Sequence, residues 1–164
     1  MSFVGSYLWR LRQKVGSELV LMPGAMVALQ RKDGQVLLTR RRDTGAWCLP
    51  AGAAEVGGSF AETAVTELAE ETGVEVALAD LIPFGCLSEA ELHTIRYPNG
   101  DLTHCFAICF LAREWSGDPR ADSDETTDIQ FTDLDRLPEP LDPPAHRALA
   151  LLESFLGDGE FQVR

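Results

Sequence analysis

Two stretches near the start of the chain are dominated by apolar and strand-forming residues. They span residues 19–30 and 35–42, and the polar turn 32–34 lies between them. Runs of this length that end at a turn containing aspartate and glycine are typical of neighbouring β-strands. We therefore expect two strands joined by that turn, preceded by a short helix over residues 7–14, where apolar and basic residues recur at helical spacing.

The rest of the chain continues with strand patterns and ends in a helical one. Residues 75–88 predict a strand, and two strands around the turn 98–101 predict a long hairpin. In residues 104–111 both alternating sets of side chains are apolar, which indicates a central strand covered on both faces. Residues 115–124 predict a loop, and residues 145–156 predict a helix. These elements predict an α/β fold with a mixed sheet between helices.

Residues 59–73 carry clear start and stop signals for a helix. Ser59 is the expected N-cap, and Glu62, three residues on, completes a capping box. Gly73 is the expected end, because glycine enters the left-handed conformation without a steric cost. The last two turns of this helix are therefore acidic.

Three glutamates, Glu67, Glu70 and Glu71, fall where a helix least favours them. An acid at the carbonyl end of a helix loses roughly 0.3 to 1 kcal/mol against the macrodipole. The three share one face and repel one another, and no lysine or arginine occurs between Ser59 and Gly73. A hard divalent cation, Mg2+ above all, would remove that repulsion. A solvated acidic surface is the alternative explanation.

The residues around these acids resemble the Nudix box, in which a glycine-containing loop leads into an acidic helix. The positions that agree with the box are Gly52, Glu67, Leu68, Glu70, Glu71, Gly73 and Val74. Two positions depart from it, since Gly58 stands where the family has glutamate and Thr66 where it has arginine. Because an acid and a base are both replaced, we hypothesise that a structural ion pair is lost while the catalytic acids remain.

The resemblance covers roughly residues 20–155 and implies both a fold and a reaction. The fold is a Nudix-type α/β/α sandwich with a mixed β-sheet, and residues 49–74 are its box loop and helix. The chain, 1–164, is then a single domain with residues 1–18 as an N-terminal helical extension. The reaction is hydrolysis of nucleoside diphosphates linked to another moiety, such as ADP-ribose, nucleotide sugars or nucleoside di- and triphosphates.

The metal site of the family corresponds to four residues of this chain. The resemblance implies Mg2+, with Mn2+ as a substitute, held by Glu67, Glu70, Glu71 and the carbonyl of Gly52. Such an ion neutralises phosphate oxygens and lowers the pKa of a bound water. The proton of that water must then pass to one of the glutamates, with Glu67 and Glu71 as candidates, or to a carboxylate from a distant loop.

The loop before the last predicted strand offers four carboxylates that could reach the metal. They are Asp122, Asp124, Glu125 and Asp128. Glu125 is our choice as a catalytic base. Most acids in such a run are only solvated, which is the alternative for each of them.

Arg41 is the predicted phosphate-binding residue. Its spacing from Trp47 is similar to that of the family's arginine, and a guanidinium suits bidentate contact with phosphate. Arg40 and Arg42 are expected on the opposite face of the strand.

A nucleotide substrate calls for an aromatic side chain that stacks on its base. Phe84, Tyr97 and Phe106 are the candidates, although a core position is the more common role for each of them. His93, His104 and His146 have no metal-binding spacing, so none of the three receives a role.

Composition and charge exclude several other classes of protein. The formal net charge is -12, which argues against a general nucleic-acid binder. Residues 19–29 are apolar but short and interrupted by Pro23 and Gly24, so neither a signal peptide nor a membrane span is expected. Four cysteines without paired spacing favour buried thiols in a reducing compartment, and we expect a cytoplasmic protein. The sequence leaves open whether the chain forms a homodimer.

Two other functions compete with hydrolysis. A Nudix-fold nucleotide sensor with little or no turnover is favoured by the departures at Gly58 and Thr66. The three glutamates argue against a sensor, because binding alone does not need a repulsive cluster. An interaction domain whose acids only solubilise it is the third hypothesis, and failure to bind divalent metal would favour it.

Overall fold

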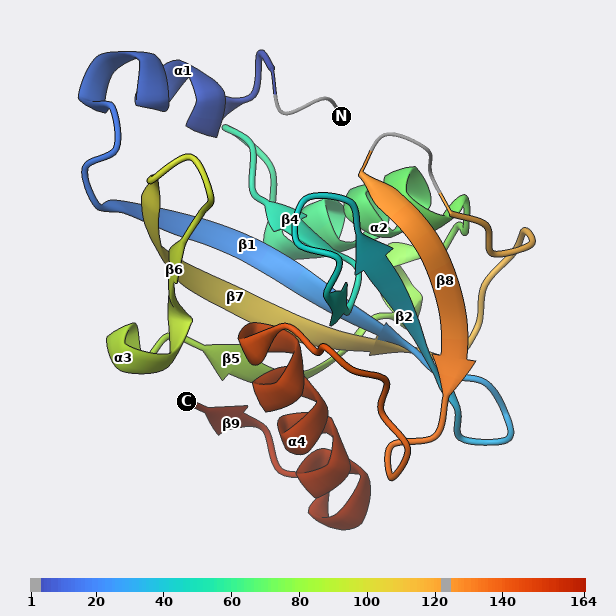
Figure 1. The fold of residues 1–164 in the computed structure, drawn as a ribbon. Coiled ribbons are helices and arrows are strands. Elements are labelled where there is room, and N and C mark those ends of the chain that lie inside the picture. Colours follow the sequence, from blue (N-terminus) through green and yellow to red (C-terminus); the bar gives the residue numbers. More distant parts are fainter. Residues whose placement is uncertain (1–3, 122–124) are drawn as a thin grey trace.

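The described part of the chain contains nine strands, four α-helices and one 3-10 helix (Figure 1). The computed structural model describes residues 4–121 and 125–164. The strands are β1 (Val20–Leu29), β2 (Val36–Arg41), β3 (Trp47–Cys48), β4 (Ala51–Ala53), β5 (Ile82–Leu87), β6 (Thr94–Arg96), β7 (Leu102–Ala112), β8 (Thr126–Thr132) and β9 (Gln162–Val163). The helices are α1 (Tyr7–Val15), α2 (Phe60–Thr72), η1 (Leu78–Asp80), α3 (Ala90–His93) and α4 (Pro143–Asp158).

Two sheets organise these strands. The larger, six-stranded sheet has the order β4-β1-β7-β5-β9, and β6 pairs with β7. It is mixed, because β1 runs parallel to β7 while β4 and β5 run antiparallel to their neighbours. The smaller sheet has the order β3-β2-β8 and is antiparallel.

Alternate residues of the central strands supply two separate hydrophobic cores. On one face, Val27 of β1 belongs to a cluster with Leu68 of α2. On the other face, Ala28 belongs to a cluster with Leu152 of α4. Leu68 and Leu152 are both 0% exposed, and full burial of such a side chain contributes about 1.5 to 3 kcal/mol. The fold is therefore the expected α/β/α sandwich, with α2 and α4 on opposite faces.

The expected central strand is confirmed in β7, which lies between β1 and β5. Cys109 and Leu111 face the α4 core, whereas Phe110 and Ala112 face the α2 core. The opening helix, the helix at the end of the chain and the irregular segment after Trp115 are also confirmed over the described residues. All four cysteines are free thiols.

The first two expected strands exist but belong to different sheets. Both edges of β1 are taken, by β4 and by β7, so β2 meets it only through the isolated bridge between Gln30 and Val36. At the turn that joins them the chain passes from the larger sheet to the smaller one, so β1 and β2 do not form a hairpin.

One other expectation needs correction. Residues 75–88 do not form one strand: Glu75 makes an isolated bridge with Ser116, η1 follows, and β5 begins only at Ile82. The exposed Leu78 shows that this first half crosses the surface between α2 and the sheet. After β8 the chain makes a turn, in which the Arg136 N–H donates to the Asp133 carbonyl at 3.0 Å.

Candidate active site

Helix α2 positions the acidic residues through the two end signals read from the sequence. The Ser59 Oγ accepts from the Glu62 N–H, and the Glu62 carboxylate accepts from the Ser59 N–H at 2.8 Å, which completes the capping box. Gly73 ends the helix in the left-handed region with φ 69°. With both ends fixed, Glu67 and Glu71 lie one turn apart on the face toward β4.

Glu71 is held by hydrogen bonds from two other elements. Its Oε1 accepts from the Ala51 N–H at 3.3 Å, and its Oε2 accepts from the Thr39 hydroxyl at 3.2 Å. Burial is the main cause that raises the pKa of Glu71 to about 8, and the negative charges of Glu67 and Glu125 add to it. Hydrogen bonding by Ala51 and Thr39 acts in the opposite direction.

Glu67 lies directly against the backbone of Gly52. A Cβ at Gly52 would fall 2.1 Å from the carboxylate carbon of Glu67. Only glycine leaves this space, so the box glycine and the first box glutamate fit together sterically. Burial raises the pKa of Glu67, and the charges of Glu125 and Glu55 raise it further.

Glu70 is half-buried on α2. The residues that line the cavity beside the helix include Glu67 and Glu71 but not Glu70. The structure therefore brings together Gly52, Glu67 and Glu71 as predicted, with Glu70 on the adjoining part of the helix.

These residues fit a hard divalent cation by their chemistry. Within the described residues, no three histidine, cysteine, aspartate or glutamate side chains are grouped closely enough to hold a metal ion. Glu71 instead directs its oxygens toward Ala51 and Thr39. Two buried carboxylates with raised pKa values beside a glycine nevertheless form an oxygen-only donor set that a divalent cation stabilises.

The raised pKa of Glu71 predicts how stability depends on pH in protein stripped of divalent metal. Below about 4.5, its ordinary value, Glu71 is protonated in both the folded and the unfolded chain and contributes no difference. As the pH rises from there through about 8, the folded state holds its proton more tightly, so stability is lost.

Thermal unfolding in a chelator across this pH range measures the effect. The Glu71→Gln variant should lose less stability over the same range than the wild-type protein. Equal losses in the two proteins would contradict the assignment of this titration to Glu71.

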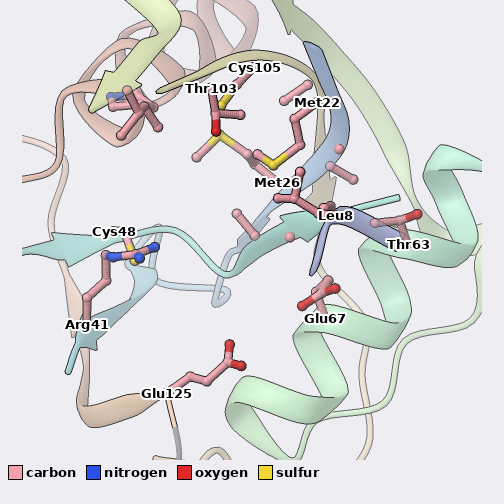
Figure 2. Close-up of a pocket in the computed structure, with 18 of the residues that line it drawn as sticks. Leu8, Met22, Met26, Arg41, Cys48, Thr63, Glu67, Thr103, Cys105 and Glu125 are labelled. Atoms are coloured by element: carbon pink, nitrogen blue, oxygen red, sulfur yellow. The ribbon is translucent and has the colours of Figure 1, made fainter. Parts of the chain in front are cut away.

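A cavity of about 750 Å³ opens beside these glutamates. Figure 2 shows Glu67 of α2 and Glu125 on one side of it and Arg41 on another, with Met22, Met26 and Cys105 farther along. We call the part of the cavity around Glu67, Glu125 and Arg41 the charged end. Methionine and cysteine side chains line the part beyond it, together with polar side chains such as Thr103.

Arg41 lies at the charged end, as predicted. Its Nε and Nη2 donate to the two carboxylate oxygens of Asp43 at 2.9 and 2.7 Å. Burial opposes its charge, but the hydrogen bonds and the charge of Asp43 outweigh that effect and raise the pKa of Arg41. The guanidinium is thus held charged and oriented at the cavity wall.

The two neighbouring arginines behave differently from one another. Arg40 lies away from the cavity, over the ring of Trp47 and bonded to the Gly45 carbonyl. Arg42 lines the cavity together with Arg41, so its expected place on the opposite face is wrong. Strand β2 ends at Arg41, and the alternation of side chains does not extend to the next residue.

Of the four loop carboxylates, Glu125 borders the cavity. It is exposed and lies on the same side of the cavity as Glu67 (Figure 2). Asp128 instead accepts from the Ile129 N–H at 2.9 Å and is not among the residues that line the cavity. Asp122 and Asp124 lie outside the described residues.

The aromatic candidates divide between core and cavity. Phe84 is 0% exposed in the α4 core, whereas Tyr97 and Phe106 line the cavity. His93, which received no role, is buried beside the cavity, and neither ring nitrogen has a hydrogen-bond partner among the described residues.

Sequence reasoning missed Thr39 and Asp43, which hold Glu71 and Arg41 in place. A threonine among the aliphatic residues of β2 was the available signal for the first. Gly58 and Thr66, the two departures from the box, also line the cavity.

No helix within residues 4–121 and 125–164 combines the length and the hydrophobicity needed to cross a bilayer.

Comparison with known proteins gives consistent results. A family model described as the NUDIX domain matches residues 20–152. The putative 8-oxo-dGTP diphosphatase of Bacillus subtilis is 32% identical over 116 residues, which cover 70% of this chain and 68% of that protein. The ADP-ribose pyrophosphatase of Methanocaldococcus jannaschii is 31% identical over 125 residues, which cover 74% of this chain and 68% of that protein. The NAD-capped RNA hydrolase NudC of Pseudomonas aeruginosa is 36% identical over 140 residues, covering 83% of this chain but only 44% of that protein.

Solved structures agree with the fold. The MutT NUDIX hydrolase from Burkholderia pseudomallei has a TM-score of 0.69 and 26% identity, covering 81% of this chain and 98% of the other. An ADP-ribose pyrophosphatase from Streptococcus suis has a TM-score of 0.64 and 26% identity, covering 87% and 98%.

Proposed function

Because this chain belongs to the Nudix family and is a metal-dependent hydrolase of phosphoric anhydride bonds, we propose that it acts on nucleoside diphosphates linked to another moiety. ADP-ribose, nucleotide sugars and nucleoside di- or triphosphates form the substrate class, and Mg2+ is the metal, with Mn2+ as a substitute. The observation that carries the proposal is the cavity that Glu67, Glu71 and Glu125 line together with Arg41.

Four groups of this chain would hold the metal. They are the carboxylates of Glu67, Glu70 and Glu71 and the carbonyl of Gly52. When bound, a divalent cation neutralises diphosphate oxygens and lowers the pKa of a bound water. Ala51 and Thr39 orient Glu71 by hydrogen bonds that fix both of its oxygens.

Glu125 is the proposed acceptor of the proton from the attacking water. Its charge raises the pKa of both Glu67 and Glu71, so it lies within electrostatic reach of both. Glu67 and Glu71 are the other catalytic candidates, and their burial favours the protonated form that follows proton transfer.

Arg41 is the proposed phosphate-binding residue, and its removal should weaken substrate binding. An Arg41→Met variant is expected to raise KM by about tenfold or more, since it deletes a charge-assisted contact with the diphosphate. Steady-state kinetics measure the change. Arg40→Met, on the same strand but away from the cavity, is the matched control, and equal KM values for both variants would contradict the role of Arg41.

Substrate class and metal are tested together by phosphate release from a panel of nucleoside diphosphate derivatives, coupled to a phosphatase. Hydrolysis in Mg2+ or Mn2+ that is abolished by chelation is the expected result. Absence of hydrolysis across the panel, with nucleotide still bound, would favour a sensor over this substrate class. The expectation that the chain does not bind nucleic acid stays a prediction. Capped RNA belongs in the panel because some relatives are named as enzymes that hydrolyse RNA ends, among them an NAD-capped RNA hydrolase and an RNA pyrophosphohydrolase.

A further inference from the structure

Helix α1 lies along the cavity although it precedes residues 20–152, which match the family model. Ser6, Leu8 and Arg12 line the cavity together with the residues of the catalytic end. Leu8 and Arg12 are four residues apart and so share one face of the helix. A segment outside the matched region therefore contributes a wall to the site.

Arg12 fixes α1 to the hairpin of β6 and β7. The residue is only 7% exposed. Its Nη2 donates to the Leu102 carbonyl and, at 2.9 Å, to the Thr103 hydroxyl, and its Nε lies 3.6 Å from a carboxylate oxygen of Asp101. Its Nη1 donates to the carbonyl of Glu18 at 2.6 Å. A buried guanidinium with this many partners holds one geometry.

Glu55 fixes the start of α1 to the loop before α2. The Tyr7 N–H donates to the Glu55 carboxylate at 2.7 Å, and the Arg10 guanidinium lies 3.9 Å from it. The partial positive charge at the N-terminus of α1 also stabilises the negative charge of this carboxylate. Helix α1 is thus attached both to the box loop and to the β6–β7 hairpin, each of which lines the cavity.

Leu8 is an apolar side chain of α1 that lines the cavity. Figure 2 shows it between Met26 and Thr63, on the side of Glu67. Met22 and Cys105 continue the apolar lining beyond it. These side chains accept an uncharged ring, with which methionine sulfur makes favourable contacts. The charged groups of Arg12 and Asp101, which also line the cavity, are paired with one another.

We propose that α1 is a specificity-determining wall that contacts a ring-bearing group of the substrate beyond the diphosphate. Leu8 is the contact residue and Arg12 the positioning residue. The cavity of about 750 Å³ falls within the range that holds a single small molecule. This inference rests on the proposed function, because it assigns selection among substrates to a wall of the same cavity.

Substitution at Leu8 tests the wall directly. Leu8→Trp fills the cavity and is expected to raise KM for the best panel substrate by about tenfold or more, with a smaller effect on kcat. The rise in KM should be smaller for a methyl diphosphate ester, which lacks the ring. Gln13→Trp places the same side chain on an exposed position of α1 and serves as the matched control. Equal KM values for Leu8→Trp and Gln13→Trp would overturn the proposal.

Arg12 is tested by rescue. Arg12→Met should raise KM by a larger factor than the factor by which it lowers kcat. In Arg12→Lys the increase in KM should be smaller, because a lysine keeps the charge but not the planar fork. Equal effects of the two variants on KM and kcat would contradict a positioning role. If Arg12→Met does not fold, the Leu8 comparison decides.

A binding measurement separates this inference from the proposed function. Calorimetry uses the α,β-methylene analogue of the best substrate, or of ADP-ribose if nothing is hydrolysed. Binding about tenfold weaker in Leu8→Trp than in Gln13→Trp supports the proposed role of α1 even if no substrate is hydrolysed. Equal affinities of the two variants contradict the proposed role of α1 even if hydrolysis is found. Absence of binding by the wild-type protein contradicts both this role and the proposed substrate class.

Discussion

Replacing Glu71 by glutamine is expected to lower the rate of diphosphate hydrolysis by about two to four orders of magnitude, and an effect of the same kind is expected for Glu70→Gln. Each change removes a negative oxygen donor that the metal needs. The fold survives, because a glutamine at position 71 still accepts the Ala51 N–H and no longer places a charge in a buried, acidic neighbourhood.

The experiment compares kcat in Mg2+ with the thermal midpoint of each variant. Glu75→Gln is the matched control, since Glu75 is exposed just beyond the end of α2. Full activity in both Glu70→Gln and Glu71→Gln would contradict the assignment of these glutamates as metal ligands.

Gly52→Ala should lower activity by about a hundredfold or more with little loss of stability. The new Cβ would fall between 2.1 and 2.4 Å from the carboxylate atoms of Glu67, so that carboxylate must move. It is the end of a flexible side chain and can rotate away, which keeps the fold but displaces a proposed metal ligand. A displacement of about 1 Å at a catalytic group costs on the order of a hundredfold in rate.

Gly58→Ala is the control for this prediction, because a Cβ there meets only the Glu55 carbonyl oxygen at 3.4 Å. The measurements are kcat/KM in Mg2+ and the thermal midpoint by circular dichroism. Retention of wild-type activity in Gly52→Ala, or a fall in its midpoint that accounts for the lost activity, would contradict the fit between Gly52 and Glu67.

Local signals in the sequence predicted the parts of the site that depend on one element. Ser59, Glu62 and Gly73 set the limits of α2 through contacts within a few residues of each other. The spacing of Arg41 from Trp47, which is similar to that in the family, identified an arginine that lines the cavity. The fold class followed in the same way, from the period of the apolar residues and from the box.

Contacts between distant segments could not be predicted from the chain alone. Thr39 and Ala51 lie 32 and 20 residues from Glu71, which they orient. Neighbouring strands β1 and β2 fall in different sheets, because β4 and β7 occupy both edges of β1. The position of α1 over the cavity depends on Arg12 reaching residues about ninety positions away, and no local pattern encodes that contact.

Binding of Mn2+, followed by electron paramagnetic resonance in the wild-type protein and in Glu71→Gln, is the most direct measurement of the central claim that the α2 carboxylates form the metal centre. We predict saturable binding by the wild-type protein and binding at least about tenfold weaker in the variant, with Glu75→Gln unchanged. Equal Mn2+ affinity in wild-type protein and Glu71→Gln, or no binding by either, would contradict the claim.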